Sequence, residues 1–144
     1  METTREHRSA AGCNPLVIIP AYNEQDSIVE VAKGVSEAGY DYVIINDGSN
    51  DATSFLCKAH ELNVVNLPQN LGIGGSVQTG HKYALEHGYD VDIQFDGDGQ
   101  HDVAYIGALI DAVNKGADLA IGSRFLTDID GFRSTRLRRA GILW

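Results

Sequence analysis

The sequence predicts an α/β fold, with a mostly parallel sheet that carries helices on both faces. Apolar runs of strand length alternate with amphipathic stretches of helix length between residues 16 and 121, and the connections are short. Residues 16–19 and 43–45 are continuously apolar, which is typical of strands buried on both faces. Ligands of such sheets bind beyond the carboxyl ends of the strands, so we expect the functional residues there.

The predicted elements follow one another in a regular order. A strand over residues 16–19 leads to a helix over 24–38, whose apolar side chains share one face and which Gly39 ends. A strand over 41–46, a turn rich in capping residues and a helix over 51–61 come next. A short strand over 63–67 precedes a glycine-rich helix over 72–87 and a strand that begins at Val91. A helix over 103–114 and a fifth strand over 117–121 complete the pattern.

Two carboxylates stand directly after the fourth predicted strand. Asp96 and Asp98 are two residues apart, so in an extended segment they point to the same side and converge on one small volume. Carboxylates this close repel each other unless a cation lies between them, and Mg²⁺ or Mn²⁺ combines one or two carboxylates with substrate phosphates. Gly97 and Gly99 let a ligand approach the backbone. The alternative is a solvated Asp-Gly turn, but polar clusters after four predicted strands together favour a site.

Composition and charge narrow the class of protein. The chain has 144 residues, of which 43% are hydrophobic, so we expect one domain over residues 15–144 after a flexible tail over 1–14. The formal net charge of −9 argues against a nucleic-acid partner. The two cysteines form no metal-binding pair, and neither a signal peptide nor an apolar run of about 20 residues is visible. We therefore expect a soluble, cytoplasmic protein.

Other nucleotide-binding motifs match only in part. Residues 72–77 resemble a dinucleotide fingerprint, but Val77 stands where the third glycine belongs. Residues 75–80 have the spacing of a P-loop, but His81 replaces the lysine that would reach the phosphates. These glycines are explained by close helix packing. The helix start around Gly74 can also help to hold a diphosphate through its free N–H groups.

Five strings, each at a predicted strand end or helix start, carry a resemblance to a known family. They are IIPAYNE at 18–24, INDGS at 45–49, QNLG at 69–72, FDGDGQH at 95–101 and GSR at 122–124. The chain resembles glycosyltransferase family 2, and within it the branch of dolichyl- or polyprenyl-phosphate mannose and glucose synthases. The resemblance implies a GT-A fold, with a Rossmann-like, mostly parallel sheet, and a nucleotide-diphosphate-sugar donor such as a UDP- or GDP-sugar.

The resemblance also implies roles for individual residues. Asp96, Asp98 and Gln100 would hold a divalent metal, Mg²⁺ or Mn²⁺, on the diphosphate. Asp98, through the metal, and Arg124 would neutralise the negative charge of the leaving diphosphate, and these two residues are the catalytic candidates. Together with Gly74, the candidates for binding the nucleotide sugar are Pro20, Ala21, Tyr22, Glu24, Asp47, Gly48, Ser49, Asp96, Gly97 and Asp98. Of these, Asp47 would contact the base or ribose. His101 is a candidate ligand and equally a structural part of the following helix start.

By resemblance, the expected reaction is inverting transfer of a hexose to a polyprenyl phosphate or to a growing cell-surface glycan. Family members continue beyond the point where this chain stops, so we expect a C-terminally truncated chain that holds the donor half and transfers sugar poorly. The alternative is a nucleotide-sugar-binding fragment or regulatory module without turnover.

The last stretch of the sequence is basic and partly apolar. Arg133, Arg136, Arg138 and Arg139 could meet a lipid phosphate or an anionic membrane, or could form a solvated amphipathic turn. An apolar end pairs readily with a second copy or with a membrane, and this end contains Leu137, Ile142, Leu143 and Trp144. We therefore expect a homodimer or, in a longer protein, association with the inner face of the membrane.

Overall fold

The computed structural model of the chain describes residues 13–122. Within them, four parallel strands form one sheet in the order β3-β2-β1-β4. The strands are β1 (Pro15–Ala21), β2 (Asp41–Asn46), β3 (Val64–Asn66) and β4 (Val91–Gln94). β1 therefore lies between β2, the next strand in the chain, and β4, which follows two further crossovers.

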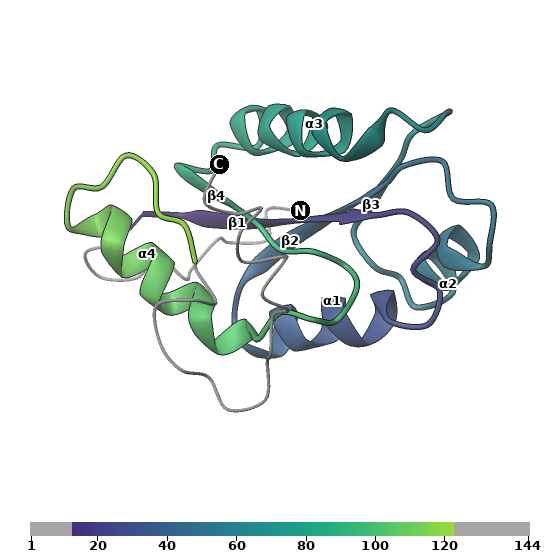
Figure 1. Cartoon of the computed structure of the whole chain (residues 1–144), viewed down its shortest axis with the longest axis horizontal. Coiled ribbons are helices and arrows are strands. Elements are labelled where there is room, and N and C mark those ends of the chain that lie inside the picture. The colour runs from purple at the N-terminus through teal and green to yellow at the C-terminus, as the bar shows by residue number, and fades with distance from the viewer. Residues whose placement is uncertain (1–12, 123–144) are drawn as a thin grey trace, which may run out of the picture.

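Helices cover both faces of this sheet (Figure 1). The long helix α3 (Gly72–Glu86) lies on one face, whereas α1 (Ile28–Glu37) and α4 (Ile106–Asn114) lie on the other. The short helix α2 (Thr53–Ala59) packs beside α1, and a 3₁₀ turn, η1 (Val103–Tyr105), leads into α4. The predicted α/β architecture is confirmed, because right-handed crossovers place helices on the faces of parallel sheets.

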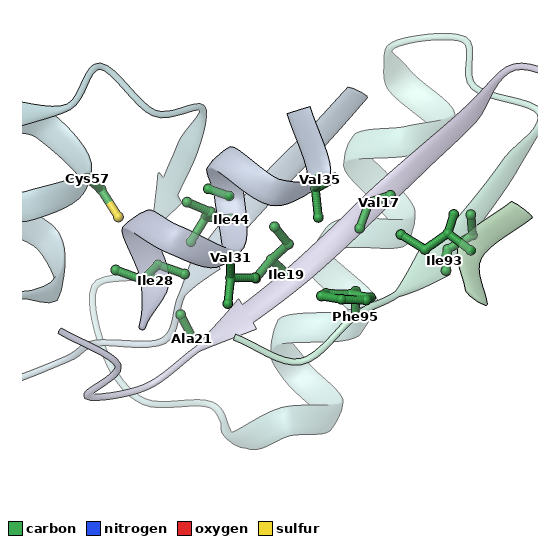
Figure 2. Packing of buried hydrophobic residues seen from close by; sticks show 12 residues of the cluster. Val17, Ile19, Ala21, Ile28, Val31, Val35, Ile44, Cys57, Ile93 and Phe95 are labelled. Carbon is green, nitrogen blue, oxygen red and sulfur yellow. The ribbon is translucent and has the colours of Figure 1, made fainter. Parts of the chain in front are cut away.

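The central strand β1 divides the core into two layers, because successive side chains of a strand point to opposite faces. Val17 and Ile19 join the cluster that α1 covers, where they pack with Val31 and Val35 (Figure 2). Leu16 and Ile18 join the cluster under α3. All of β1 from Leu16 to Ala21 is buried, as the continuous apolar run predicts.

The close approach of α3 to the sheet depends on Gly80. A Cβ atom on this residue would lie 2.3 Å from Cγ2 of Ile18, so only glycine lets the helix settle on β1. Ala84, one turn later, is buried in the same layer as Leu16. The helix therefore runs antiparallel to β1, and its first turns lie over the carboxyl end of that strand. This is the helix packing that the glycine pattern indicates.

Residues 117–121 do not form the fifth strand that the sequence predicts. They pair with no strand of the described sheet, and Leu119 and Ile121 are 75% and 77% exposed. An apolar pattern becomes a strand only where a neighbouring strand and a covering layer accept its two sides. Residues 13–122 provide neither for this segment. Ser123 and Arg124, which we placed at the end of that strand, lie outside the described residues.

Candidate functional site

A cavity of about 210 Å³ opens where the strands of the sheet end. Its walls come from the ends of β1, β2 and β4 and from the first turns of α3. The residues around it are Pro20, Ala21, Tyr22, Glu24, Asp47, Ile73, Ser76, Asp96, Gly97 and Asp98. Parallel strands present their carboxyl ends at one edge, which explains why three polar clusters far apart in the sequence meet here.

The two carboxylates after β4 each retain an oxygen for a ligand. Asp96 Oδ1 accepts a hydrogen bond from Gln94 Nε2 (3.1 Å), and Asp98 Oδ1 accepts one from the Gln100 N–H (2.9 Å). Within residues 13–122, no hydrogen bond reaches the Oδ2 atom of either residue. Gly97 between them is buried, and its carbonyl accepts a hydrogen bond from Ser27 Oγ (2.6 Å), which fixes the loop against the start of α1.

The third carboxylate of the cavity, Asp47, lies at the end of β2 and is only 3% exposed. Its Oδ1 accepts a hydrogen bond from the Leu71 N–H (2.7 Å), and its own N–H donates to the Ala21 carbonyl (2.9 Å). Gly48 follows with φ +66°, and a Cβ there would lie 2.8 Å from Asn70 N. Asp47 therefore fixes the segment that starts α3 as well as facing the cavity.

Hydrogen bonds join the loop after β1 to the loop after β2. The Asn23 N–H donates to Ser49 Oγ (3.0 Å), and the Asn50 N–H donates to Asn23 Oδ1 (2.8 Å). Ser49 Oγ donates in turn to Asn46 Oδ1 (2.6 Å). Asn23 has φ +56°, a left-handed conformation that asparagine tolerates better than most residues. The rim of the cavity is therefore held by side chains that bond to backbone across two loops.

Glu24 belongs to the same rim, and its surroundings raise the pKa of its carboxyl. Burial raises the pKa of its carboxyl above 4.5, and the nearby carboxylates Asp98, Asp51 and Asp96 raise it further. The hydrogen bond from Ser27 Oγ to Glu24 Oε2 (3.3 Å) acts in the opposite direction. Negative charge therefore accumulates on this side of the cavity, and a bound cation would relieve it.

The sequence pattern of Glycosyl transferase family 2 matches residues 16–144 of the chain. The chain belongs to glycosyltransferase family 2. Polyprenol monophosphomannose synthase of Mycolicibacterium smegmatis is 33% identical over 143 residues, covering 88% of this chain and 54% of that protein. UDP-N-acetylglucosamine–dolichyl-phosphate N-acetylglucosaminyltransferase of Methanococcus voltae is 35% identical over 127 residues, covering 75% of this chain and 51% of that protein. The chain thus spans about half the length of these relatives.

A solved structure shows the same fold as this family 2 chain. Glucosyl-3-phosphoglycerate synthase of Mycobacterium tuberculosis, in complex with Mn²⁺, uridine diphosphate and glucosyl-3-phosphoglycerate, aligns with a TM-score of 0.61 at 21% identity. The alignment covers 76% of this chain and 46% of that one. Together with the parallel sheet, it confirms the predicted GT-A fold. Among residues 13–122, no helix is long and apolar enough to cross a membrane.

Not every candidate of the family 2 site lies against the cavity. Eight of the predicted residues line it, namely Pro20, Ala21, Tyr22, Glu24, Asp47, Asp96, Gly97 and Asp98. Gly48 and Ser49 support the loop behind it, Gly74 lies in the first turn of α3, and Gln100 is exposed beyond Asp98. Arg124 lies outside the described residues.

Two residues of α3 that we did not predict also line the cavity. Ile73 and Ser76 belong to the string that we compared with a dinucleotide fingerprint, and that comparison drew attention to its glycines instead. Ser76 stands one turn before Gly80, on the face of α3 that packs on the sheet. Helical spacing from Gly80 and Ala84 would have placed it there.

Proposed function

We propose that this family 2 chain binds a nucleotide-diphosphate sugar, with a divalent cation on the diphosphate, for inverting transfer of a hexose. The observation that carries the proposal is that the ends of three strands bring Asp47, Asp96 and Asp98 to one cavity. A polyprenyl phosphate is the favoured acceptor, because relatives named as a polyprenol monophosphomannose synthase and as a dolichyl-phosphate N-acetylglucosaminyltransferase are 33% and 35% identical to this chain. A growing glycan is the other acceptor that we predict.

The oxygen ligands that the cavity offers suit Mg²⁺ or Mn²⁺. Within residues 13–122, no group of three or more His, Cys, Asp or Glu side chains could hold a metal ion by itself. Two carboxylates with free oxygens suit an ion that takes its remaining ligands from a diphosphate and water. Asp96 and Asp98 would hold this cation, with Gln100 as a further candidate. When bound, it would neutralise charge that develops on the leaving diphosphate. The structural relative solved with Mn²⁺ and uridine diphosphate supports this choice.

The residues around the cavity then divide the work. Asp47, at the end of β2, lies two strands away from Asp96 and Asp98, at the end of β4, and would contact the nucleoside. The acceptor oxygen attacks the anomeric carbon, the bond to the diphosphate breaks, and the nucleoside diphosphate leaves. A phosphate acceptor is already anionic, so this step needs no strong general base. Arg124 would face the phosphates of the donor.

The binding test is a titration of the chain with UDP, GDP and dTDP in the presence and absence of Mn²⁺. We expect Asp98→Asn to abolish the Mn²⁺-dependent part of the affinity, while Asp111→Asn, a change of an exposed carboxylate on α4, leaves it intact. Unchanged Mn²⁺-dependent binding by Asp98→Asn would refute the metal assignment.

A nucleotide-sugar-binding module without turnover is the second candidate, because eight of the ten residues around the described cavity are ones that we assign to the donor. Incubation with radiolabelled UDP- and GDP-sugars and polyprenyl phosphate separates the two. Labelled lipid supports transfer, whereas tight donor binding without labelled lipid supports the module.

A further inference from the structure

The hydroxyl of Ser76 has no hydrogen-bond partner in the described part of the chain. The residue is 1% exposed, and its Oγ is buried without a donor or acceptor within reach. A buried polar group that makes no hydrogen bond costs stability, and native structures contain few of them. Among the buried side-chain nitrogen and oxygen atoms of residues 13–122, this is the one that stands alone.

The position of Ser76 makes the missing partner informative. Gly80 contacts Ile18 of β1, and Ser76 lies one helical turn earlier, toward the carboxyl end of that strand. Pro20 lies two residues beyond Ile18 in the same strand, and both Ser76 and Pro20 line the cavity. The side chain of Ser76 therefore borders the proposed donor site, although its Oγ is closed to solvent in the ligand-free chain.

The surroundings of Ser76 suit a flat ligand with a polar edge. Pro20 and Ile73 supply apolar walls beside it, and the Asp47 carboxylate borders the same cavity. The cation-binding pair is at the end of β4, separated from Asp47 by the central strand. A nucleobase combines apolar faces with a hydrogen-bonding edge, whereas a diphosphate would require cations or several N–H donors.

We propose that Ser76 is a binding residue for the nucleotide, and that its hydroxyl hydrogen-bonds to the polar edge of the nucleobase. This inference rests on the proposed function of the cavity and adds to it a residue on α3. A serine hydroxyl both donates and accepts, so it can meet either kind of group on a base edge. The ligand-free chain carries an unpaired hydroxyl, and the bound nucleotide satisfies it.

Ser76→Ala distinguishes this binding role from a purely structural one. A binding role predicts a more stable variant with weaker nucleotide affinity, whereas a structural role predicts a less stable variant. Without the unpaired hydroxyl, the ligand-free variant should melt higher than wild type, by about 2–8 °C. Its affinity for UDP or GDP should fall by about two- to tenfold, the effect of one neutral hydrogen bond. Its affinity for Mn²⁺-pyrophosphate, which has no base, should stay unchanged.

Ser36→Ala is the matched control, because it makes the same change at an exposed position of α1. It should alter neither nucleotide affinity nor the affinity for Mn²⁺-pyrophosphate. Unchanged UDP and GDP affinity in Ser76→Ala would overturn the inference, and so would an equal loss for pyrophosphate, since the hydroxyl would then serve the diphosphate. If the wild-type chain bound neither nucleotide, the proposed function itself would fall, and this inference with it.

Discussion

Asp47 has two contacts to satisfy, and this decides how its role can be tested. One oxygen holds the Leu71 N–H at the start of α3, so Asp47→Ala would disturb the helix as well as the proposed nucleoside contact. Asp47→Asn keeps an amide oxygen for Leu71, removes the charge and replaces the second acceptor oxygen with an NH₂ donor. The isosteric change is therefore the informative one.

We expect Asp47→Asn to weaken UDP or GDP binding by about tenfold to a hundredfold even in chelator-treated buffer, the cost of a hydrogen bond to a charged acceptor. Binding of Mn²⁺-pyrophosphate should be unaffected, because Asp47 lies at the other end of the cavity from Asp96 and Asp98. Isothermal titration of both ligands measures this. Equal nucleotide affinity in wild type and variant would show that Asp47 only holds α3.

The raised pKa of Glu24 predicts that the stability of the chain depends on pH. Its pKa in the folded chain is raised above 4.5 by burial and by neighbouring carboxylates, so the folded state favours the protonated form. The stability that this group contributes is thus present below pH 4.5 and is lost as the pH rises through the raised pKa. In Glu24→Gln this loss should disappear.

Urea unfolding of wild type and Glu24→Gln in chelator, at closely spaced pH values above 4.5, measures the effect. Glu86→Gln, at the exposed end of α3, is the control and should retain the wild-type slope. A Glu24→Gln variant with the wild-type slope would mean that other groups dominate the titration.

At the scale of elements, the contact between α3 and β1 controls the shape of the site. Gly80→Ala places a methyl group within 2.3 Å of Ile18, so either the helix or the strand must shift. We expect the free energy of unfolding to fall by about 1–3 kcal/mol, the usual cost of overpacking. Nucleotide affinity should also fall, because Ile73 and Ser76 move with the helix.

Gly74→Ala provides the comparison for this prediction. A Cβ at Gly74 has open space around it, and alanine favours a helix over glycine by about 0.5–1 kcal/mol. Chemical denaturation of the two variants should therefore show opposite signs. Two equally stable variants would contradict the packing that we describe.

The sequence correctly predicted those elements that depend on residues nearby in the chain or that carry a strong pattern of apolar residues. The strand over 41–46 was predicted to the residue, because its apolar run needs only to be buried on both faces. The predicted helix over 24–38 begins later, at Ile28, and Glu24 and Gln25 before it donate their N–H groups to Thr53 and Asp51. Such a contact between two loops has no periodic signature.

The site was predictable to the same extent. Asp47, Asp96 and Asp98 follow strands, so topology alone brings them to one edge. Ser76 was missed because the comparison with nucleotide-binding motifs drew attention to the glycines of its string, although helical spacing from Gly80 and Ala84 places it on the same face. Asn23 and Ser49 act through hydrogen bonds between loops, which a motif records as residue types without their geometry.

At the scale of the whole molecule, binding of the donor nucleotide should appear as global stabilisation. A ligand at a hundred times its dissociation constant adds about 2.7 kcal/mol to the free energy of unfolding. We expect UDP or GDP with Mn²⁺ to raise the melting temperature by more than the sum of the shifts that the two components cause separately. Asp98→Asn should lose the extra shift. Additive shifts from metal and nucleotide in the wild type would mean that they bind at separate places.

The strand order carries a consequence for how the chain folds. β1 pairs with β4, whose residues lie more than half of the chain length away, while β2 and β3 are close in sequence. Contacts between distant segments form slowly, because the entropy cost of closing a long loop comes before the contacts stabilise the chain. In a folding intermediate that contains only β1, β2 and β3, Asp47 would be in place, but Asp96 and Asp98 would not. Mn²⁺-dependent nucleotide binding during refolding should therefore appear only after β4 has docked. Stopped-flow measurements can follow this binding and the burial of Phe95 separately. Binding that preceded the burial of Phe95 would contradict this order.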